Sequence, residues 1–353
     1  MAINFYMENL IPFTVTDLSK ITNHRSGEIK FGEKMLTMPI DIDPIVFLNT
    51  CEAKYVLFGI PEDIGVRANF GRPGTASAWE CAIKSIANIQ HNRFCKGNQI
   101  LVLGQLDVSQ DMKEVAHLNF NKVNDRTKLS QLVEKIDKEV SHIIFTITKS
   151  GKIPIIIGGG HNNAYGNIKG SALAKGKPIN AINFDAHSDF RILEGRHSGN
   201  GFSYVYEEGF LKKYFIFGLH ENYTSKSVLD IIKKTEDRVR YNTYESINIR
   251  NEKDFNQEMT LALKFIETDP FGIEIDLDAL PNIPSSAMTS SGFSIEQLRL
   301  FITFFAKHKN ASYIHICEGA PELCTDKNNH LIGKLIGYLI TDFIKAKNST
   351  EQL

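Results

Sequence analysis

Residues 153–189 read IPIIIGGGHNNAYGNIKGSALAKGKPINAINFDAHSD, and this stretch sets the expected architecture of the whole chain. Two short apolar runs, at 153–157 and 180–184, are typical of buried strands, and a helical segment near 163–175 lies between them. The same alternation continues on both sides. We expect further strands at 55–60, 99–104, 214–218, 271–277 and 312–317, and helices near 75–88, 129–149, 225–234, 254–267, 294–308 and 328–347.

Strands that are almost continuously apolar and alternate with helices predict a parallel sheet that is buried on both faces. The fold class is therefore predicted to be α/β, as a single three-layer α/β/α domain with a mostly parallel sheet. The polar first 50 residues are expected to be an extension that packs on this domain, which would span residues 51–353. In such sheets the functional site lies at the carboxyl ends of the strands.

Three segments at the ends of predicted strands carry the side chains that bind metals in proteins. They are GGGH at 158–161, DAHSD at 185–189 and DLD at 276–278. Oxygen and imidazole ligands without a thiolate suit Mn²⁺ or a similar dication, and six ligands exceed the needs of one ion. The sequence thus predicts a two-metal site with bridging carboxylates. Its candidate ligands are His161, Asp185, His187, Asp189, Asp276 and Asp278.

The spacing within these segments suggests how the ligands converge. If the strand continues through Asp185, His187 and Asp189, their side chains point to one face, because strand residues alternate. Asp276 and Asp278 follow the same rule. Glu274 shares their face and is expected beside the ligands without being one. The alternative interpretation is a solvated polar loop, but ionisable groups that converge after an apolar strand are costly without a cation.

The bulk properties narrow the class of protein. The chain has 353 residues with 40 basic and 41 acidic side chains, so a nucleic-acid partner is not indicated. No apolar run is long enough for a membrane span, and the N-terminus lacks the pattern of a signal peptide. Five widely spaced cysteines without a CxxC pair are typical of reduced thiols. We expect a cytoplasmic protein with a small-molecule substrate and no membrane partner.

The order GGGH, DAHSD, DLD resembles the ureohydrolase family, which includes arginase, agmatinase and formimidoylglutamase. The resemblance covers roughly residues 55–345. It implies an arginase-like domain with two Mn²⁺ ions, for which Fe²⁺ or Co²⁺ could substitute, and a homo-oligomer, either a trimer or a hexamer. One ion would be held by His161, Asp185, Asp189 and Asp276. The other would be held by His187, Asp185, Asp276 and Asp278.

The resemblance also implies a reaction and the residues that serve it. An activated water would attack the amidine or guanidine carbon of the substrate, and Asp278 would relay its proton. Glu318 matches the acidic residue that holds the cationic end of the substrate. His197 lies one residue from the family's proton-carrying histidine, so it is a candidate proton carrier or a residue at the mouth of the site. Asn200 is a candidate substrate contact.

Three features are similar to the formimidoylglutamase branch: the loop GVRANFGR at 65–72, Arg191 after DAHSD, and DLDALP at 276–281. Arginine suits bidentate binding of carboxylates, and N-formimidoyl-L-glutamate carries two of them. Arg67, Arg72 and Arg191 are therefore candidate substrate-binding residues, although they could instead pair with acidic residues and shape loops. The alternatives are arginase or another guanidino-compound hydrolase that releases urea, and a binding protein of this fold without turnover.

Overall fold

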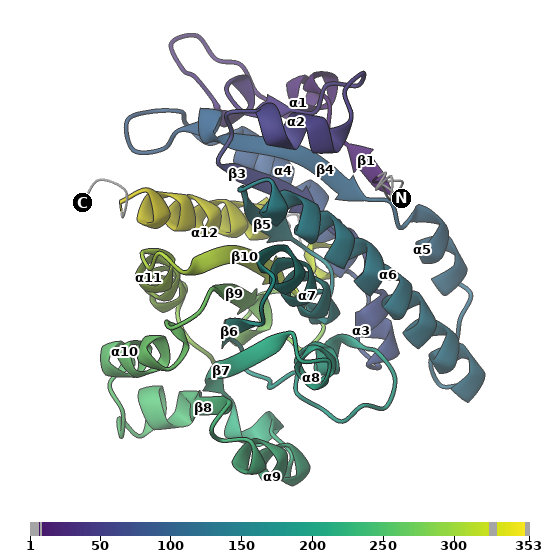
Figure 1. Cartoon of the computed structure of the whole chain (residues 1–353), viewed down its shortest axis with the longest axis vertical. Coiled ribbons are helices and arrows are strands. Elements are labelled where there is room, and N and C mark those ends of the chain that lie inside the picture. The colour runs from purple at the N-terminus through teal and green to yellow at the C-terminus, as the bar shows by residue number, and fades with distance from the viewer. Residues whose placement is uncertain (1–6, 8, 325–329, 350–353) are drawn as a thin grey trace.

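The computed structural model describes residues 7, 9–324 and 330–349. Within them the strands form one ten-stranded sheet in the order β1-β4-β3-β5-β10-β9-β6-β7-β8, with β2 beside β4 (Figure 1). Only β1 runs antiparallel to its neighbour β4 among the described pairs. The strands are β1 (Leu10–Pro12), β2 (Leu36–Thr37), β3 (Tyr55–Gly59), β4 (Ile100–Leu106), β5 (Ile153–Ile157), β6 (Ile179–Phe184), β7 (Leu211–Leu219), β8 (Val239–Thr243), β9 (Phe271–Asp276) and β10 (Ala311–Cys317).

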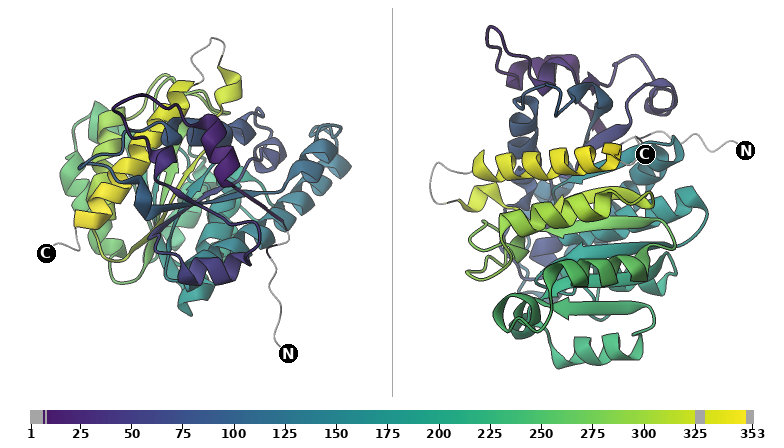
Figure 2. Two further views of the ribbon diagram at one scale, coloured as in Figure 1. Left: turned by 90° about the horizontal axis from the view of Figure 1, so that it is seen from above. Right: turned by 90° about the vertical axis from the view of Figure 1, so that its left-hand side faces the viewer.

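Helices cover both faces of the sheet, which confirms the predicted three-layer α/β fold (Figure 2). One face is covered by α4 (Ala78–Ala87), α10 (Phe255–Ile266), α11 (Ile295–Ala306) and α12 (His330–Ser349). The other is covered by α6 (Val123–Lys149), α7 (Ala164–Lys175), α8 (Gly201–Glu207) and α9 (Lys226–Lys234). Neighbouring residues of one strand serve opposite faces: Phe215 packs in the first core and Ile216 in the second.

Several elements differ from the sequence expectations. The sequence indicated no strand at β8, because this edge strand exposes Arg240 and Tyr241 and lacks an apolar run. The expected loop after β3 contains a short helix, α3 (Ile64–Ala68), and a 3-10 turn precedes α4. A further short helix, α5 (Ser109–Val115), precedes α6, which begins at Val123, earlier than expected. Residues 328 and 329, at the expected start of the last helix, lie outside the described residues.

The N-terminal segment is part of the sheet as well as a covering layer. Its strands β1 and β2 both pair with β4, and it carries the helices α1 (Val15–Ile21) and α2 (Pro44–Thr50). Phe13 packs edge-on against Trp79 of α4, with ring centroids 6.3 Å apart. The sequence indicated none of these elements, because short amphipathic pieces give a weak periodic signal. Within the described residues, no helix combines the length and apolar character of a membrane span.

The strand order brings the candidate metal segments together. β5, β10, β9 and β6 are consecutive neighbours in the sheet and run parallel. Their carboxyl ends therefore meet at one edge, where His161 follows β5, Asp276 ends β9 and Asp185 follows β6. The fourth strand, β10, delivers Glu318 to the same edge.

Candidate metal centre

The turn after β5 places His161 at the floor of the site. Gly158 and Gly159 have φ angles of 90° and 72°, a region that favours glycine. A Cβ on Gly159 would lie 2.3 Å from Asn163 Nδ2, so the turn also needs glycine for space. The Gly-rich segment is thus required for the sharp change of direction that brings His161 under the sheet edge.

Glu62, which the sequence did not single out, holds this turn in place. Its buried carboxylate accepts hydrogen bonds from Gly160 N (3.0 Å) and Asn163 Nδ2 (2.6 Å) with one oxygen, and from Ile64 N (2.6 Å) with the other. The loop after β3 is thereby tied to the loop after β5. No feature of the sequence around Glu62 pointed to this role.

Four predicted ligands form the first cluster of the centre. His161 Nδ1 lies 2.8 Å from Asp189 Oδ2, 3.2 Å from Asp185 Oδ2 and 3.3 Å from Asp276 Oδ2. All four ligand atoms lie within 4.8 Å of one another, and the four residues are buried. His161 Nδ1 nevertheless makes no hydrogen bond within the described residues. A cation between these atoms would give the buried nitrogen and the three carboxylates a common partner.

The remaining ligands form a second cluster that shares Asp185 with the first. Asp185, His187 and Asp278 bring ligand atoms within 4.8 Å of one another. His187 Nδ1 lies 3.2 Å from Asp278 Oδ2 and 3.6 Å from Asp185 Oδ1. Asp278 Oδ1 is buried and has no hydrogen-bond partner among the described residues. The two candidate clusters thus adjoin each other through the shared carboxylate of Asp185.

The ligands after β6 and β9 converge differently from the alternation that their spacing suggested. β6 ends at Phe184, and Asp189 adopts a left-handed conformation with φ 43°, so the segment is not extended. His187 N donates to Asp185 Oδ1 at 2.6 Å, which folds the segment back on itself. Asp278 likewise lies in a 3-10 turn and donates its N–H to Asp276 Oδ1 at 2.8 Å. Tight turns, and not strand alternation, bring these side chains together.

Glu274 lies behind His161, as its position on β9 suggested. Its carboxylate accepts a hydrogen bond from Tyr313 Oη (2.6 Å), pairs with His315 Nδ1 (2.6 Å), and lies 3.6 Å from His161 Nε2. Burial opposes its ionisation, but His315 and His161 outweigh burial and lower the pKa of Glu274 to about 2. A buried carboxylate behind a ligand histidine helps to orient the ring.

The electrostatics of the centre also favour cations. Burial and the neighbouring Asp278 and Asp185 raise the pKa of Asp276 well above its ordinary value. Burial and Asp185 likewise raise the pKa of Asp189. In Asp185, the neighbouring imidazoles of His161 and His187 outweigh burial and lower the pKa. Crowded carboxylates without a cation therefore retain protons that a dication would displace.

Metal binding is expected to release protons and to weaken as the pH falls. The raised pKa of Asp276 and Asp189 means that protons compete with the metal, so the apparent affinity should rise with pH until both carboxylates are ionised. Calorimetric titration with Mn²⁺ in two buffers of different ionisation enthalpy measures this release. Equal heats in both buffers, or an affinity independent of pH, would contradict the expectation.

A cavity of about 670 Å³ opens above the two clusters. His187, Asp189, Asp276 and Asp278 form part of its wall, and Glu318 lies beside them. The Glu318 backbone has a φ of 60°, and its Oε1 accepts a hydrogen bond from His161 N at 2.8 Å. Burial and the neighbouring Asp278 raise the pKa of Glu318 to about 8.

The four candidate substrate contacts other than Glu318 lie in different places. Arg191 lines the cavity. Arg67 pairs with Asp63 at 2.6 Å, and Arg72 donates to the carbonyl oxygens of Ser285 and Ser286. The Asn200 amide is buried, with its oxygen bound by Arg196 and its nitrogen donating to Gly195 O. Among the described residues, the lining of the cavity above the two clusters does not include Arg67, Arg72 or Asn200.

His197, the candidate proton carrier, is not among the described residues that line the cavity above the two clusters. It lines a second cavity, and its Nδ1 accepts a hydrogen bond from Gly199 N at 3.1 Å. Burial and the neighbouring Arg191 lower its pKa to about 4, so the ring is neutral near neutral pH.

Tyr223 is a cavity residue that sequence reasoning missed. Its ring stacks on that of His187 with centroids 5.5 Å apart, and on its other side lies His220 at 5.6 Å. The residue follows β7 in a segment without a recognisable motif, so no local pattern pointed to it. Asn69 and Glu194 also line the cavity without having been selected.

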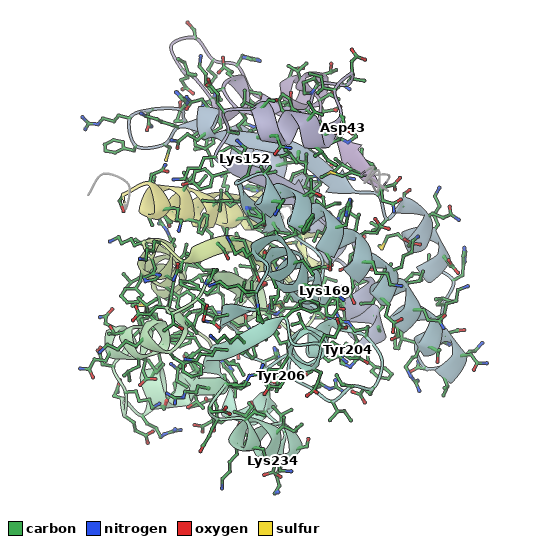
Figure 3. The ribbon with its side chains drawn as sticks, viewed as in Figure 1. Asp43, Lys152, Lys169, Tyr204, Tyr206 and Lys234 are labelled. Atoms are coloured by element: carbon green, nitrogen blue, oxygen red, sulfur yellow. The ribbon has the colours of Figure 1, made fainter. Side chains whose placement is uncertain are left out.

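Arg196 is a buried cation that ties the site to α6. Its guanidinium pairs with Asp137 of α6 at 2.8 Å, donates to Asn162 O at 3.0 Å, and lies over the ring of Tyr204. Tyr204 belongs to α8, and its side chain is labelled in Figure 3. The guanidinium thus joins the His161 loop, the 196–200 loop and two helices through one buried group.

Substituting Arg196 by Met is expected to reduce the free energy of unfolding by about 3–5 kcal/mol, because Asp137 would remain buried without its partner. Urea denaturation measures the loss. Arg250→Met is the matched control: that arginine forms an exposed pair with Glu221, for which a loss of at most about 1 kcal/mol is expected. Similar losses in the two variants would show that burial of Arg196 does not matter.

Comparison with known proteins agrees with this geometry. The model of the arginase family matches residues 53–341. A formimidoylglutamase from Macrococcus caseolyticus (strain JCSC5402) is 25% identical over 289 residues, which cover 80% of this chain and 82% of the relative.

Solved structures share the fold. A formimidoylglutamase from Bacillus subtilis superposes with a TM-score of 0.74 at 17% identity, covering 93% of this chain and 95% of that chain. Trypanosoma cruzi formiminoglutamase with Mn²⁺ superposes with a TM-score of 0.67 at 16% identity, covering 86% and 97%. The resemblance noted in the three motifs is thereby confirmed, and this chain belongs to the arginase family.

Proposed function

We propose that this protein is a metal-dependent hydrolase of linear amidines, and that it converts N-formimidoyl-L-glutamate and water to L-glutamate and formamide. The observation that carries the proposal is the presence, in one cavity, of metal ligands, a buried carboxylate (Glu318) and an arginine (Arg191). This combination suits a substrate with an amidinium at one end and carboxylates at the other. Relatives that bear the name formimidoylglutamase support the same substrate.

We propose that the centre holds two Mn²⁺ ions, with Fe²⁺ or Co²⁺ as possible substitutes. The first would be held by His161, Asp185, Asp189 and Asp276, and the second by His187, Asp185, Asp276 and Asp278. The first cluster contains all four residues assigned to the first ion, and the second contains Asp185, His187 and Asp278. The part of Asp276 at the second ion rests on the family resemblance alone. When bound, the dications supply the acidification of water that makes hydroxide available near neutral pH.

The protein's own groups have distinct tasks in this reaction. Asp278 Oδ1 is buried and lacks a hydrogen-bond partner among the described residues, so it can accept the proton of the attacking water. Glu318 can accept hydrogen bonds from the amidinium nitrogens while its Oε1 remains bound to His161 N. We assign the proton transfer to Asp278 and not to His197, because His197 faces the second cavity.

Recognition of the substrate carboxylates is assigned to Arg191, which lines the cavity. Arg67 and Arg72 contact Asp63 and the 285–286 backbone, so we propose that they shape the wall beside Arg191. Asn200, bound at both ends of its amide, would position the loop that carries Ser198 and Gly199.

A side-by-side assay of the Mn²⁺-loaded protein tests the proposal. It follows glutamate and formamide release from N-formimidoyl-L-glutamate, and urea release from arginine, agmatine and guanidinobutyrate. Turnover of the first substrate alone is the expected result. Release of urea from a guanidine substrate would leave the proposed metal centre in place but would contradict the role of Arg191 in binding substrate carboxylates. No turnover of any of them, despite two bound metals, would favour the binding protein without catalysis.

We further propose a cytoplasmic enzyme built as a homo-oligomer, a trimer or hexamer, in which residues 51–353 form the catalytic domain and residues 1–50 an extension. No disulfide joins the five cysteines, all of which lie within the described residues, and this supports a reducing compartment. Analytical ultracentrifugation gives the oligomeric state directly.

A further inference from the structure

Two neighbouring cavities share part of their lining, and one of them contains the candidate metal ligands. The first, of about 670 Å³, contains the metal ligands, and the second, of about 610 Å³, lies beside α6. Asn69, Arg191 and Glu194 line both cavities. Each of these three side chains therefore borders both cavities and can turn toward either one.

Arg191 is already bound to a carboxylate of its own chain. Its Nη2 donates to Glu194 Oε1 at 2.6 Å, and its Nη1 donates to Asn69 Oδ1 at 2.7 Å. The side chains of Arg191 and Glu194 are 46% and 40% exposed, so the pair is hydrated and weak. The Arg191 guanidinium, which we assign to the substrate carboxylate, is therefore occupied by the carboxylate of Glu194 in this structure.

Glu194 has a second partner, His197, which lines the second cavity. His197 Nδ1 accepts a hydrogen bond from Gly199 N, so a neutral ring carries its proton on Nε2. That nitrogen lies 3.3 Å from Glu194 Oε1, and His197 lines the second cavity. The same oxygen thus already contacts both Arg191 and His197, so if Glu194 leaves Arg191 the contact with His197 and the second cavity remain available to its carboxylate.

We propose that Glu194 is a specificity-determining residue that occupies the carboxylate position of Arg191 and is displaced toward His197 when an acidic ligand binds. The inference rests on the proposed function for the choice of a dicarboxylate. Ligands without a carboxylate cannot displace Glu194, so Arg191 stays paired and the cavity offers them no free cation. Glu194 would thereby make binding at Arg191 selective: a ligand with a carboxylate can replace Glu194 there, and a neutral or cationic compound cannot.

Glutarate tests this inference because it has two carboxylates and no amine that Glu194 could attract. Its dissociation constant is measured by calorimetry on the full-length, Mn²⁺-loaded protein and on Glu194→Gln. We expect glutarate to bind Glu194→Gln about two- to fivefold more tightly, the range for removal of an exposed competing ion pair. Glu252→Gln, which removes an equal charge from the exposed pair with Arg250, is the matched control and should leave the constant unchanged.

The variants Arg191→Met and Arg191→Met/Glu194→Gln complete a double-mutant cycle. Both should bind glutarate more weakly than the wild type, and the Glu194 substitution should have no effect once Arg191 is gone. Three outcomes would each overturn the inference. Glu194→Gln could bind glutarate no more tightly than the wild type, or Glu194→Gln could tighten glutarate binding equally when Arg191 is Met. The third is that glutarate binds to none of the variants.

The kinetic readout separates this inference from the proposed function. With N-formimidoyl-L-glutamate, Glu194→Gln should lower KM by a similar factor and leave kcat unchanged. If the protein does not hydrolyse that substrate but glutarate binding follows the cycle, the proposed reaction fails and the role of Glu194 stands. If hydrolysis occurs and Glu194→Gln raises KM, the role of Glu194 fails and the proposed reaction stands.

Discussion

Replacing Asp276 by Asn is expected to weaken Mn²⁺ binding by at least about a hundredfold, because loss of even an outer partner of a ligand typically costs ten- to a hundredfold. Asp276 lies in the first cluster, 3.3 Å from His161 Nδ1. Asparagine keeps the shape of the side chain but removes the charge that balances the dications. Hydrolysis should fall to background with the metal.

Metal content after dialysis, measured by atomic emission, and turnover under saturating Mn²⁺ are the two readouts. Asp269→Asn is the matched control, since Asp269 lies just before the same strand and pairs with Lys177 and Lys212 at the surface. That control should retain metal and activity. A metal-free Asp276→Asn protein that remained fully active would disprove the metal-dependent mechanism.

Replacing Glu318 by Gln is expected to lower kcat/KM by on the order of a hundredfold while metal content stays unchanged, because a hydrogen bond to a charged partner contributes about 1.5–3 kcal/mol. The amide oxygen of Gln can still accept from His161 N, so the floor of the site should keep its shape. What is lost is the ability to ionise: the pKa of Glu318 is raised to about 8 in the free protein, but a bound amidinium favours the charged carboxylate, which Gln cannot form.

Steady-state kinetics and metal analysis of Glu318→Gln are compared with Glu322→Gln, an exposed glutamate in the following 3-10 turn. The control should behave like the wild type. Loss of metal from Glu318→Gln would instead assign this carboxylate to the integrity of the centre. Unchanged kinetics would remove it from substrate binding altogether.

The sequence predicted those features that depend on local chemistry. The apolar run 153–157 coincides with β5, and the end of α7 at Lys175 is followed by Gly176 with a φ of 65°, as a helix stop requires. The segments GGGH, DAHSD and DLD contain the residues that the structure gathers into two clusters. In each case the signal is a residue type at fixed spacing, and a few neighbours suffice to create it.

Other features had no local signal. The edge strand β8 exposes part of its surface and so lacks the apolar run of an inner strand. Glu62, Arg196 and Tyr223 acquire their roles through partners far away in the chain, such as Gly160, Asp137 and His187. Nothing in the residues around them distinguishes these side chains from ordinary surface groups.

The sequence by itself determined the α/β class, the ligand types and the strand ends that carry them. Tertiary structure alone decided that β5, β10, β9 and β6 are neighbours, so that four segments spread between His161 and Glu318 share one edge. It also decided that Arg191 faces the cavity while Arg67 faces Asp63. The physical reason is that strand order and side-chain pairing depend on packing between distant segments, whereas periodicity and ligand chemistry are properties of the local chain.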